Sequence, residues 1–182
     1  DTVRFTRVAG NIGFNDSSRV TIDTLVATDA LGRATMRVYA GSIPTASLVR
    51  AYLHSTIDDS VSFNIASVPR AVSSLQLAVN SSWTAGLNEA VTITALDQYG
   101  NVTTNALSSV TLSGLNTSSL QIAPSATLAL SNGIASFIVR DTVANKRLRI
   151  QATESGVGAQ VLSNNVIVNH SAAARFTVDT VM

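Results

Sequence analysis

Side chains that could carry out chemistry are few in this sequence, and they lie far apart. The chain contains two histidines, His54 and His170, and no cysteine. Nucleophilic catalysis needs a serine, threonine or cysteine beside a base that an acid orients. His54 precedes a polar loop at residues 55–60, and His170 falls at a joint between two predicted units. We therefore predict strand-end or solvent-facing positions for both histidines and expect no catalytic site.

Two groups of acidic residues could bind a cation. Asp58 and Asp59 are adjacent, and Asp97 opens the segment Asp97-Gln98-Tyr99-Gly100-Asn101. Ca²⁺ takes carboxylate and carbonyl oxygens as ligands, and paired carboxylates also suit acid–base catalysis. Both groups equally suit turns, because aspartate bonds backbone N–H groups two residues further on and glycine takes positive φ. We predict turns at both places, with weak Ca²⁺ binding by Asp97, Asp58 or Asp59 as the alternative and no other cofactor.

The composition excludes other classes of function. Only 13% of the residues are charged, and the formal net charge is +1. Nucleic-acid binding needs a concentrated basic surface. Here basic residues gather only at Lys146, Arg147 and Arg149, which we assign to a solvated strand face, with an anionic glycan contact as the alternative. No apolar run reaches the roughly 20 residues that cross a bilayer, so we expect no nucleic-acid partner and no membrane span in this segment.

Apolar and polar residues alternate along most of the chain. This period of two is typical of β-strands with one buried face, and no stretch keeps the 3.6-residue period of a helix. Turn residues separate the runs at Ala85-Gly86, Gly100-Asn101, Asn132-Gly133 and Asn164-Asn165. The pattern predicts an all-β, immunoglobulin-like β-sandwich. Its strands are expected to contain residues 3–5, 34–38, 49–53, 61–65, 75–79, 91–95, 110–112, 120–122, 128–130, 135–139, 148–152 and 166–168.

The sequence also repeats itself. Residues 32–38 match residues 133–139, and residues 71–77 match residues 172–178, with the two members of each pair 101 residues apart. About 100 residues is the length of one immunoglobulin-type domain. The repeat therefore predicts such domains in tandem.

The phase of the repeat predicts the domain boundaries. Residues 69–169 form a complete immunoglobulin-like domain, residues 1–68 hold only the later strands of a preceding one, and residues 170–182 hold the first strand of a following one. A sandwich without its first two strands exposes a bare edge. We expect upstream sequence or a neighbouring copy of the chain to supply them. The short joints lack glycine, so successive domains should form a semi-rigid rod.

One combination of motifs carries a family resemblance. Thr84-Ala85-Gly86 is followed by Val91-Thr92-Ile93-Thr94-Ala95-Leu96-Asp97-Gln98-Tyr99-Gly100-Asn101 and then by Ser131-Asn132-Gly133-Ile134-Ala135-Ser136-Phe137. This resembles the bacterial Ig-like domains of invasin/intimin type, over roughly residues 70–169. The resemblance implies a repeating spacer or adhesive module on an extracellular bacterial surface, without catalytic residues.

Three functions remain open from the sequence. The first is a stalk or spacer of an adhesin, a structural module of a large extracellular bacterial surface protein whose partners are neighbouring Ig-like domains and a host or surface glycan or protein ligand. The second is a self-assembling filament or surface-layer subunit that exchanges strands between copies. The third is an accessory carbohydrate-binding module of a secreted enzyme. That third function predicts an exposed aromatic strip, yet Trp83, Tyr39, Tyr52 and Tyr99 share no strand face, and we predict that Trp83 packs in the core or at a joint.

Overall fold

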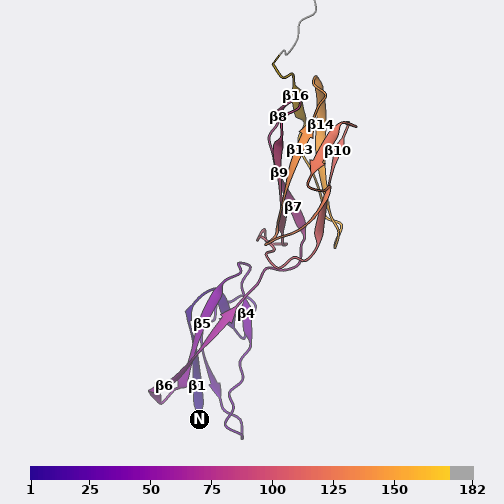
Figure 1. The fold of residues 1–182 in the computed structure, drawn as a ribbon. Helices are drawn as coiled ribbons and strands as arrows, with labels where there is room; N and C mark the ends of the chain where they lie inside the picture. Colours follow the sequence, from indigo (N-terminus) through magenta and orange to yellow (C-terminus); the bar gives the residue numbers. More distant parts are fainter. Residues whose placement is uncertain (173–182) are drawn as a thin grey trace, which may run out of the picture. The chain divides into compact units, whose positions relative to one another are not determined.

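The computed structural model describes residues 1–172, apart from the side chains of Ile57 and Asp58. The chain divides into two compact units, Asp1–Arg70 (unit 1) and Ala71–Met182 (unit 2), which Figure 1 shows in indigo to magenta and in magenta to yellow. All sixteen described elements are strands and none is a helix, which confirms the all-β prediction. The predicted first strand of a following domain, residues 170–182, falls almost entirely outside the described residues.

Unit 2 is a sandwich of two sheets. One sheet has the order β11-β13-β9-β7, and the other has the order β12-β10-β14-β16-β8, with β15 also paired to β14. Strands β7, β9, β13 and β11 correspond to A, B, E and D of an immunoglobulin domain, and β10, β14 and β16 correspond to C, F and G. The predicted immunoglobulin-like sandwich is therefore confirmed. Its strands are β7 (Ser74–Val79), β8 (Ser82–Thr84), β9 (Glu89–Leu96), β10 (Ser109–Leu115), β11 (Leu120–Ala123), β12 (Thr127–Ala129), β13 (Ile134–Asp141), β14 (Lys146–Glu154), β15 (Gln160–Leu162) and β16 (Val166–Asn169).

The core of unit 2 lies between the two sheets and follows the alternation of the sequence. Val91 and Ile93 on β9 are fully buried, and they lie opposite Phe137 and Ala135 on β13. Every second residue of β13 and β14 is buried in the same way. Burying one large aliphatic or aromatic side chain contributes roughly 1.5–3 kcal/mol. The inward-facing residues of these central strands therefore supply most of the driving force for folding.

Unit 1 has a smaller and less complete set of strands. One sheet has the order β3-β1-β5-β6, and β2 pairs with β4 in a separate two-stranded sheet. Its buried core consists of Phe5, Ile12, Phe14, Val49 and Ala51. The strands are β1 (Thr2–Ala9), β2 (Ile12–Phe14), β3 (Asp23–Ala27), β4 (Val38–Ala40), β5 (Ala46–Leu53) and β6 (Thr56–Ala66).

The strand pairs of unit 1 have counterparts in unit 2 with the same register. β1 and β5 pair as β10 and β14 do, and β2 and β4 pair as β11 and β13 do. Equivalent pairs are Phe5–Ala51 and Leu112–Ala152, and Gly13–Tyr39 and Gln121–Arg140. Within the described residues, unit 1 has no counterpart of β7, β8 or β9.

The predicted strand at residues 34–38 is mostly wrong. Only Val38 lies in a strand, since β4 begins there, and residues 34–37 form no described strand. Their counterparts in unit 2 pair with β9, whereas no described strand occupies that position in unit 1. Alternation makes a segment suitable for a sheet, but a strand also needs a partner for its backbone N–H and C=O groups.

A core substitution tests this account of unit 2. Phe137→Ala should lower the free energy of unfolding by about 3–5 kcal/mol, because Phe137 is 1% exposed and its removal leaves a cavity. Ile138→Ala is the matched control, since Ile138 is exposed on the outer face of the same strand, and it should cost less than about 1 kcal/mol. Urea unfolding followed by fluorescence reports unit 2 alone, because the chain's single tryptophan, Trp83, is buried there. Equal losses in both variants would contradict the assigned core.

Candidate functional site

Asp97 closes a tight turn at the end of β9. Its Oδ1 accepts hydrogen bonds from the backbone N–H groups of Tyr99 at 2.8 Å and Asn101 at 3.0 Å. The Asn101 Nδ2 donates to both carboxylate oxygens, at 3.1 and 3.0 Å. The Gly100 N–H donates to the Asp97 carbonyl oxygen, and Gly100 has a φ of +82°. The side chain is buried, so these N–H donors replace its hydration.

The same geometry bears on the predicted Ca²⁺ role of Asp97. Both carboxylate oxygens already face N–H donors, and a cation needs oxygen ligands instead. Within the described residues, no three His, Cys, Asp or Glu side chains gather closely enough to hold a metal ion. The arrangement at Asp97 is suited to fixing a turn.

A second aspartate closes a turn of the same kind in unit 1. Asp29 Oδ1 accepts hydrogen bonds from the N–H groups of Leu31 at 2.8 Å and Arg33 at 2.9 Å. The Gly32 N–H donates to the Asp29 carbonyl oxygen, as Gly100 does in the turn of unit 2. Both turns have the spacing Asp-x-x-Gly, and this spacing is the sequence signal that identifies the turns at Asp29 and Asp97 as equivalent.

The predicted turn at Asp58 and Asp59 is wrong. The turn between β5 and β6 is formed by His54 and Ser55, because Leu53 pairs with Thr56. The next pair is Tyr52 with Ser60, so residues 57–59 are extra residues in β6. Asp59 is exposed, while the side chain of Asp58 lies outside the described residues.

A buried charged cluster in unit 2 was missed from the sequence. The side chain of Asp141 is fully buried, and its Oδ2 lies 2.7 Å from the Lys146 Nζ. Asp141 also accepts hydrogen bonds from Thr117, Ser119 and the backbone N–H of Val143. Burial would raise the pKa of Asp141, but its ion pair and hydrogen bonds outweigh burial and lower the pKa to about 2.

This cluster corrects the assignment of Lys146 to a solvated face. Its side chain is 19% exposed, and its Nζ donates to the hydroxyls of Thr117 and Ser119. Of its two basic neighbours, Arg147 is exposed, and Arg149 donates from Nε to the Ser163 carbonyl oxygen at 2.9 Å. The alternating pattern predicted the strand β14 correctly. It could not show that the segment with Thr117 and Ser119 lies against Lys146, the first residue of β14.

Glu154 ends β14 and also closes a turn. Its carboxylate accepts hydrogen bonds from the N–H groups of Gly156 at 2.9 Å and Val157 at 2.8 Å. Burial would raise the pKa of Glu154, yet the hydrogen bonds that it accepts lower the pKa below its ordinary value. Asp97 and Glu154 thus bind donors of their own turns, whereas Asp141 also binds Thr117 and Ser119 from a distant segment.

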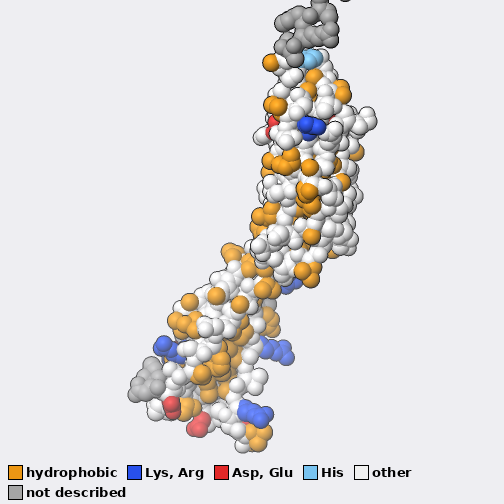
Figure 2. Space-filling view, in the orientation of Figure 1, with side chains coloured by type: hydrophobic (Ala, Val, Ile, Leu, Met, Phe, Trp, Pro, Cys, Tyr) orange, Lys and Arg blue, Asp and Glu red, His pale blue; other side chains and the backbone are white. Residues whose placement is uncertain are grey.

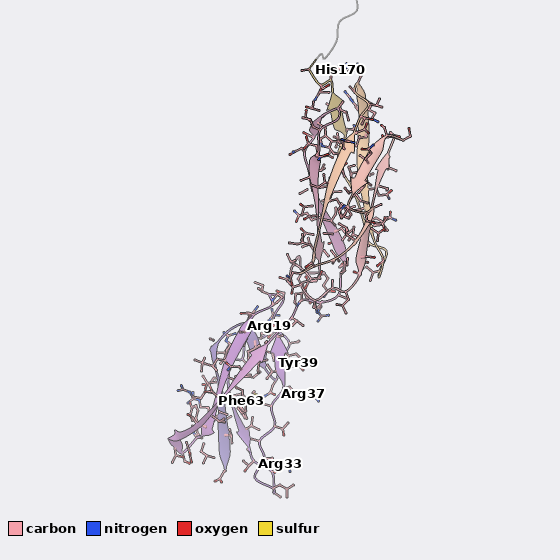
Figure 3. The ribbon with its side chains drawn as sticks, in the orientation of Figure 1. Arg19, Arg33, Arg37, Tyr39, Phe63 and His170 are labelled. Carbon is pink, nitrogen blue, oxygen red and sulfur yellow. The ribbon has the colours of Figure 1, made fainter. Side chains whose placement is uncertain are left out.

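The remaining residues that could do chemistry do not form a common site. His54 is exposed in the β5–β6 turn, and His170 is exposed after β16, at the end of unit 2 in Figure 3. Trp83 is 2% exposed and belongs to the core of unit 2. Tyr99 lies in the Asp97 turn of unit 2, whereas Tyr39 and Tyr52 belong to unit 1. Trp83 therefore cannot join an exposed aromatic strip. Because no described element is a helix, the described residues contain no helix able to cross a membrane.

No protein-family model matches the chain, and no curated protein matches it. Among solved structures, the D0-D1 domain of intimin matches 91% of this chain and 79% of its own, at 18% identity and a TM-score of 0.41. Domains 4-9 of surface layer protein SbsC match 97% of this chain at 14% identity and a TM-score of 0.43. A glycosyl hydrolase family 2 member from Bacteroides cellulosilyticus matches 92% at 11% identity and a TM-score of 0.47. This chain covers 31% and 28% of the latter two chains. Such similarities assign neither a family nor an activity.

Substitution of Asp97 separates a turn from a cation site. Asp97→Ala should destabilise unit 2 by about 2–3 kcal/mol, because it removes the buried carboxylate that accepts hydrogen bonds from the N–H groups of Tyr99 and Asn101. Gln98→Ala, at an exposed position of the same turn, should change stability by less than about 0.5 kcal/mol. Ca²⁺ at about 10 mM, above the Kd range of weak extracellular sites, should leave the urea midpoint of the unmodified chain unchanged. A midpoint raised by Ca²⁺ and lost with Asp97→Ala would contradict the turn assignment.

The lowered pKa of Asp141 predicts a pH dependence. Its folded pKa of about 2 lies below the ordinary 3.8, so its contribution to stability is present above about pH 4 and is lost as the pH falls through about 2. Asp141→Asn should cost about 2 kcal/mol at pH 7. The difference between the two proteins should shrink between about pH 4 and pH 2, measured by urea unfolding with Trp83 fluorescence. A constant difference over this range would show that ionisation of Asp141 does not stabilise the fold.

Proposed function

We propose that the chain is a load-bearing structural module, a stalk or spacer of a large extracellular bacterial surface protein built from tandem Ig-like domains. The observation that carries this proposal is the pairing of β8 with β16. These two strands lie near opposite ends of the sequence of unit 2, yet they run parallel and are hydrogen-bonded side by side. The pairing determines how unit 2 responds to tension along the chain.

Tension along the chain loads the β8–β16 pair in shear. The chain enters unit 2 through β7 and β8 and leaves it after β16, so pulling on the two ends drives the parallel strands past each other. The hydrogen bonds between them then carry the load together, whereas strands peeled from one end lose their bonds one at a time. Ile167 N–H donates to the Ser81 carbonyl oxygen, and Ala85 N–H donates to the Asn169 carbonyl oxygen, each at 2.9 Å.

Side chains reinforce both strands of this pair. Asn169 Nδ2 donates to Ser82 Oγ at 2.8 Å and to the Trp83 carbonyl oxygen at 3.2 Å. Trp83 anchors β8 in the core, and Val166 and Val168, each 1% exposed, anchor β16. The two strands therefore cannot slide without also exposing core side chains to water.

Other observations support a structural role at a bacterial surface. Units 1 and 2 share strand registers, which supports a tandem arrangement. The motifs of residues 84–101 and 131–137 resemble bacterial Ig-like domains, and the chain contains no cysteine, so its fold does not depend on disulfides. The buried carboxylates close turns, so we propose that the module is not catalytic. Neighbouring domains of the same polypeptide would be its partners, together with a surface ligand bound elsewhere.

Single-molecule pulling tests this role. The full chain, held by handles at its two ends, should release unit 2 in one event. Its contour length should grow by about 35 nm, from about 0.35 nm for each of the roughly 100 extended residues. Ile167→Pro should lower the unfolding force, because it removes the N–H that donates to Ser81.

Ile167→Ala is the matched control, since it trims an exposed side chain and keeps the N–H. It should leave the unfolding force near that of the unmodified chain. Release of unit 2 in several low-force steps, or an equal force for the two substitutions, would argue against a load-bearing β8–β16 pair.

A further inference from the structure

Five asparagines of the chain stand in a sequence pattern that sugar-transferring enzymes recognise. The pattern is Asn-x-Ser/Thr, where x is not proline, and modified asparagines lie at the surface. Such an enzyme must reach both the carboxamide of the asparagine and the hydroxyl two residues further on. The five asparagines are Asn15, Asn80, Asn101, Asn116 and Asn169.

The fold of unit 2 binds the carboxamides of Asn101 and Asn169. Asn101 Nδ2 donates to both carboxylate oxygens of Asp97, and the hydroxyl of its pattern, on the fully buried Thr103, donates to a backbone carbonyl oxygen. Asn169 Nδ2 donates to Ser82 Oγ and to a backbone carbonyl oxygen of β8. Transfer of a sugar to either Nδ2 would have to break these hydrogen bonds first.

The carboxamides of Asn80 and Asn15 are also held. Asn80 Nδ2 donates to Glu89 Oε2 at 3.1 Å. The hydroxyl of the same pattern, on Ser82, accepts the hydrogen bond from β16. In unit 1, Asn15 Oδ1 accepts a hydrogen bond from the backbone N–H of Arg37 at 3.2 Å, which fixes the plane of its carboxamide. Four of the five patterns are therefore engaged in the fold.

Asn116 differs from the other four asparagines. It lies in the turn between β10 and β11, and both Asn116 and Ser118, which bears the hydroxyl of the pattern, are exposed. Neither side chain makes a hydrogen bond or an ion pair with any residue that the structure describes. The carboxamide and the hydroxyl are therefore both available to an enzyme.

Thr117 fixes the shape of this turn from the inside. Its Oγ1 donates to Asp141 Oδ2 and accepts from Lys146 Nζ, each at 2.7 Å. Asn116 has a φ of +62°, in the left-handed region that asparagine tolerates better than most residues. The middle residue of the pattern thus binds the buried charged cluster, while Asn116 and Ser118 face solvent. The acceptor is presented on a turn that is tied to the fold.

The surface of unit 2 has few charges that could hydrate it. Only 13% of the residues of the chain are charged, and the visible face of unit 2 in Figure 2 carries few charged side chains. Leu115, next to Asn116, is 37% exposed. Soluble proteins generally rely on surface charge to stay apart, and an attached glycan supplies hydration without charge. A sugar at Asn116 would therefore suit a surface of this composition.

We propose that Asn116 is the N-glycosylation site of this chain. Its Nδ2 forms a bond to C1 of a sugar, and the bond between C1 and a phosphate oxygen of the donor breaks. The diphosphate leaves with the electron pair, and one Nδ2 proton passes to a base of the transferase. The donor is a sugar activated as its diphosphate, carried by a nucleotide or by a lipid. The inference goes beyond the load-bearing role and does not depend on the strength of the β8–β16 pair.

Mass spectrometry of the chain isolated from the cells that make it tests the proposal. The peptide that contains Asn116 should carry a glycan, and the peptides of the other four patterns should not. A single hexose, about 160 Da, would indicate a nucleotide-linked donor, and a longer oligosaccharide would indicate a lipid-linked donor. An unmodified Asn116, or glycans only on other asparagines, would overturn the proposal.

A reconstituted reaction tests why Asn116 is selected. The folded chain, given uridine diphosphate glucose and a soluble N-glycosyltransferase, should gain a hexose at Asn116 at least about tenfold faster than at the other asparagines, because their carboxamides must first leave their hydrogen bonds. Five short peptides, each with one of the patterns, should react at similar rates. Equal rates at all five asparagines of the folded chain would contradict the selection by the fold.

Three variants complete the reconstituted test. Asn116→Gly removes the carboxamide but keeps the positive φ, and Ser118→Ala removes the hydroxyl, so each should abolish the fast modification. Asn80→Ala is the matched control, because it removes another exposed asparagine of the same pattern, and it should leave the rate at Asn116 unchanged. Modification that persists in Asn116→Gly would place the acceptor elsewhere. None of these results affects the single-molecule test of the β8–β16 pair.

Discussion

The folded structure depends on burying alternate aliphatic side chains between two sheets. In unit 2, Val91 and Ile93 meet Phe137 and Ala135 across neighbouring strands, and their inward faces cover those of β10 and β14. Removal of this apolar surface from water is the dominant favourable contribution to folding. Turns, buried charges and strand ends are arranged so that they do not interrupt it. Asp97 and Glu154, for example, end two central strands by binding the N–H groups of the turns that follow.

The two units show that a strand is a property of its surroundings as well as of its sequence. Residues 34–38 and 135–139 have a similar alternation and lie 101 residues apart in the sequence. The second segment is a full strand between β11 and β9, whereas most of the first forms no described strand. Side chains at equivalent positions also differ in burial, as Val38 and Val139 do. The difference arises from the neighbouring strands, because the local patterns are nearly identical.

Sequence alone located the longer strands and the fold class but not the details that depend on contacts distant in sequence. Alternating runs of five residues were detected because several consecutive positions support one period. Three-residue strands give a period little support: β12 was predicted from Leu128 and Leu130, but β2, β8 and β15 were not. The turn at Asp97 was predicted from the local sequence, because Tyr99 and Asn101, whose N–H groups bind its carboxylate, are only two and four residues further on. The cluster of Asp141 and Lys146 was missed, because Thr117 and Ser119 approach it from more than twenty residues away.

The way in which unit 2 accommodates carboxylates affects how it responds to dissolved salt. Screening by ions weakens interactions between exposed charges that are well separated, and it acts much less on buried groups in direct contact. Asp97 and Glu154 are bound by backbone N–H groups, and the one ion pair that the described part of unit 2 contains, Asp141–Lys146, is largely buried. The stability of unit 2 should therefore change little between fresh and saline water, so the same fold would serve in surroundings whose ionic strength is not controlled.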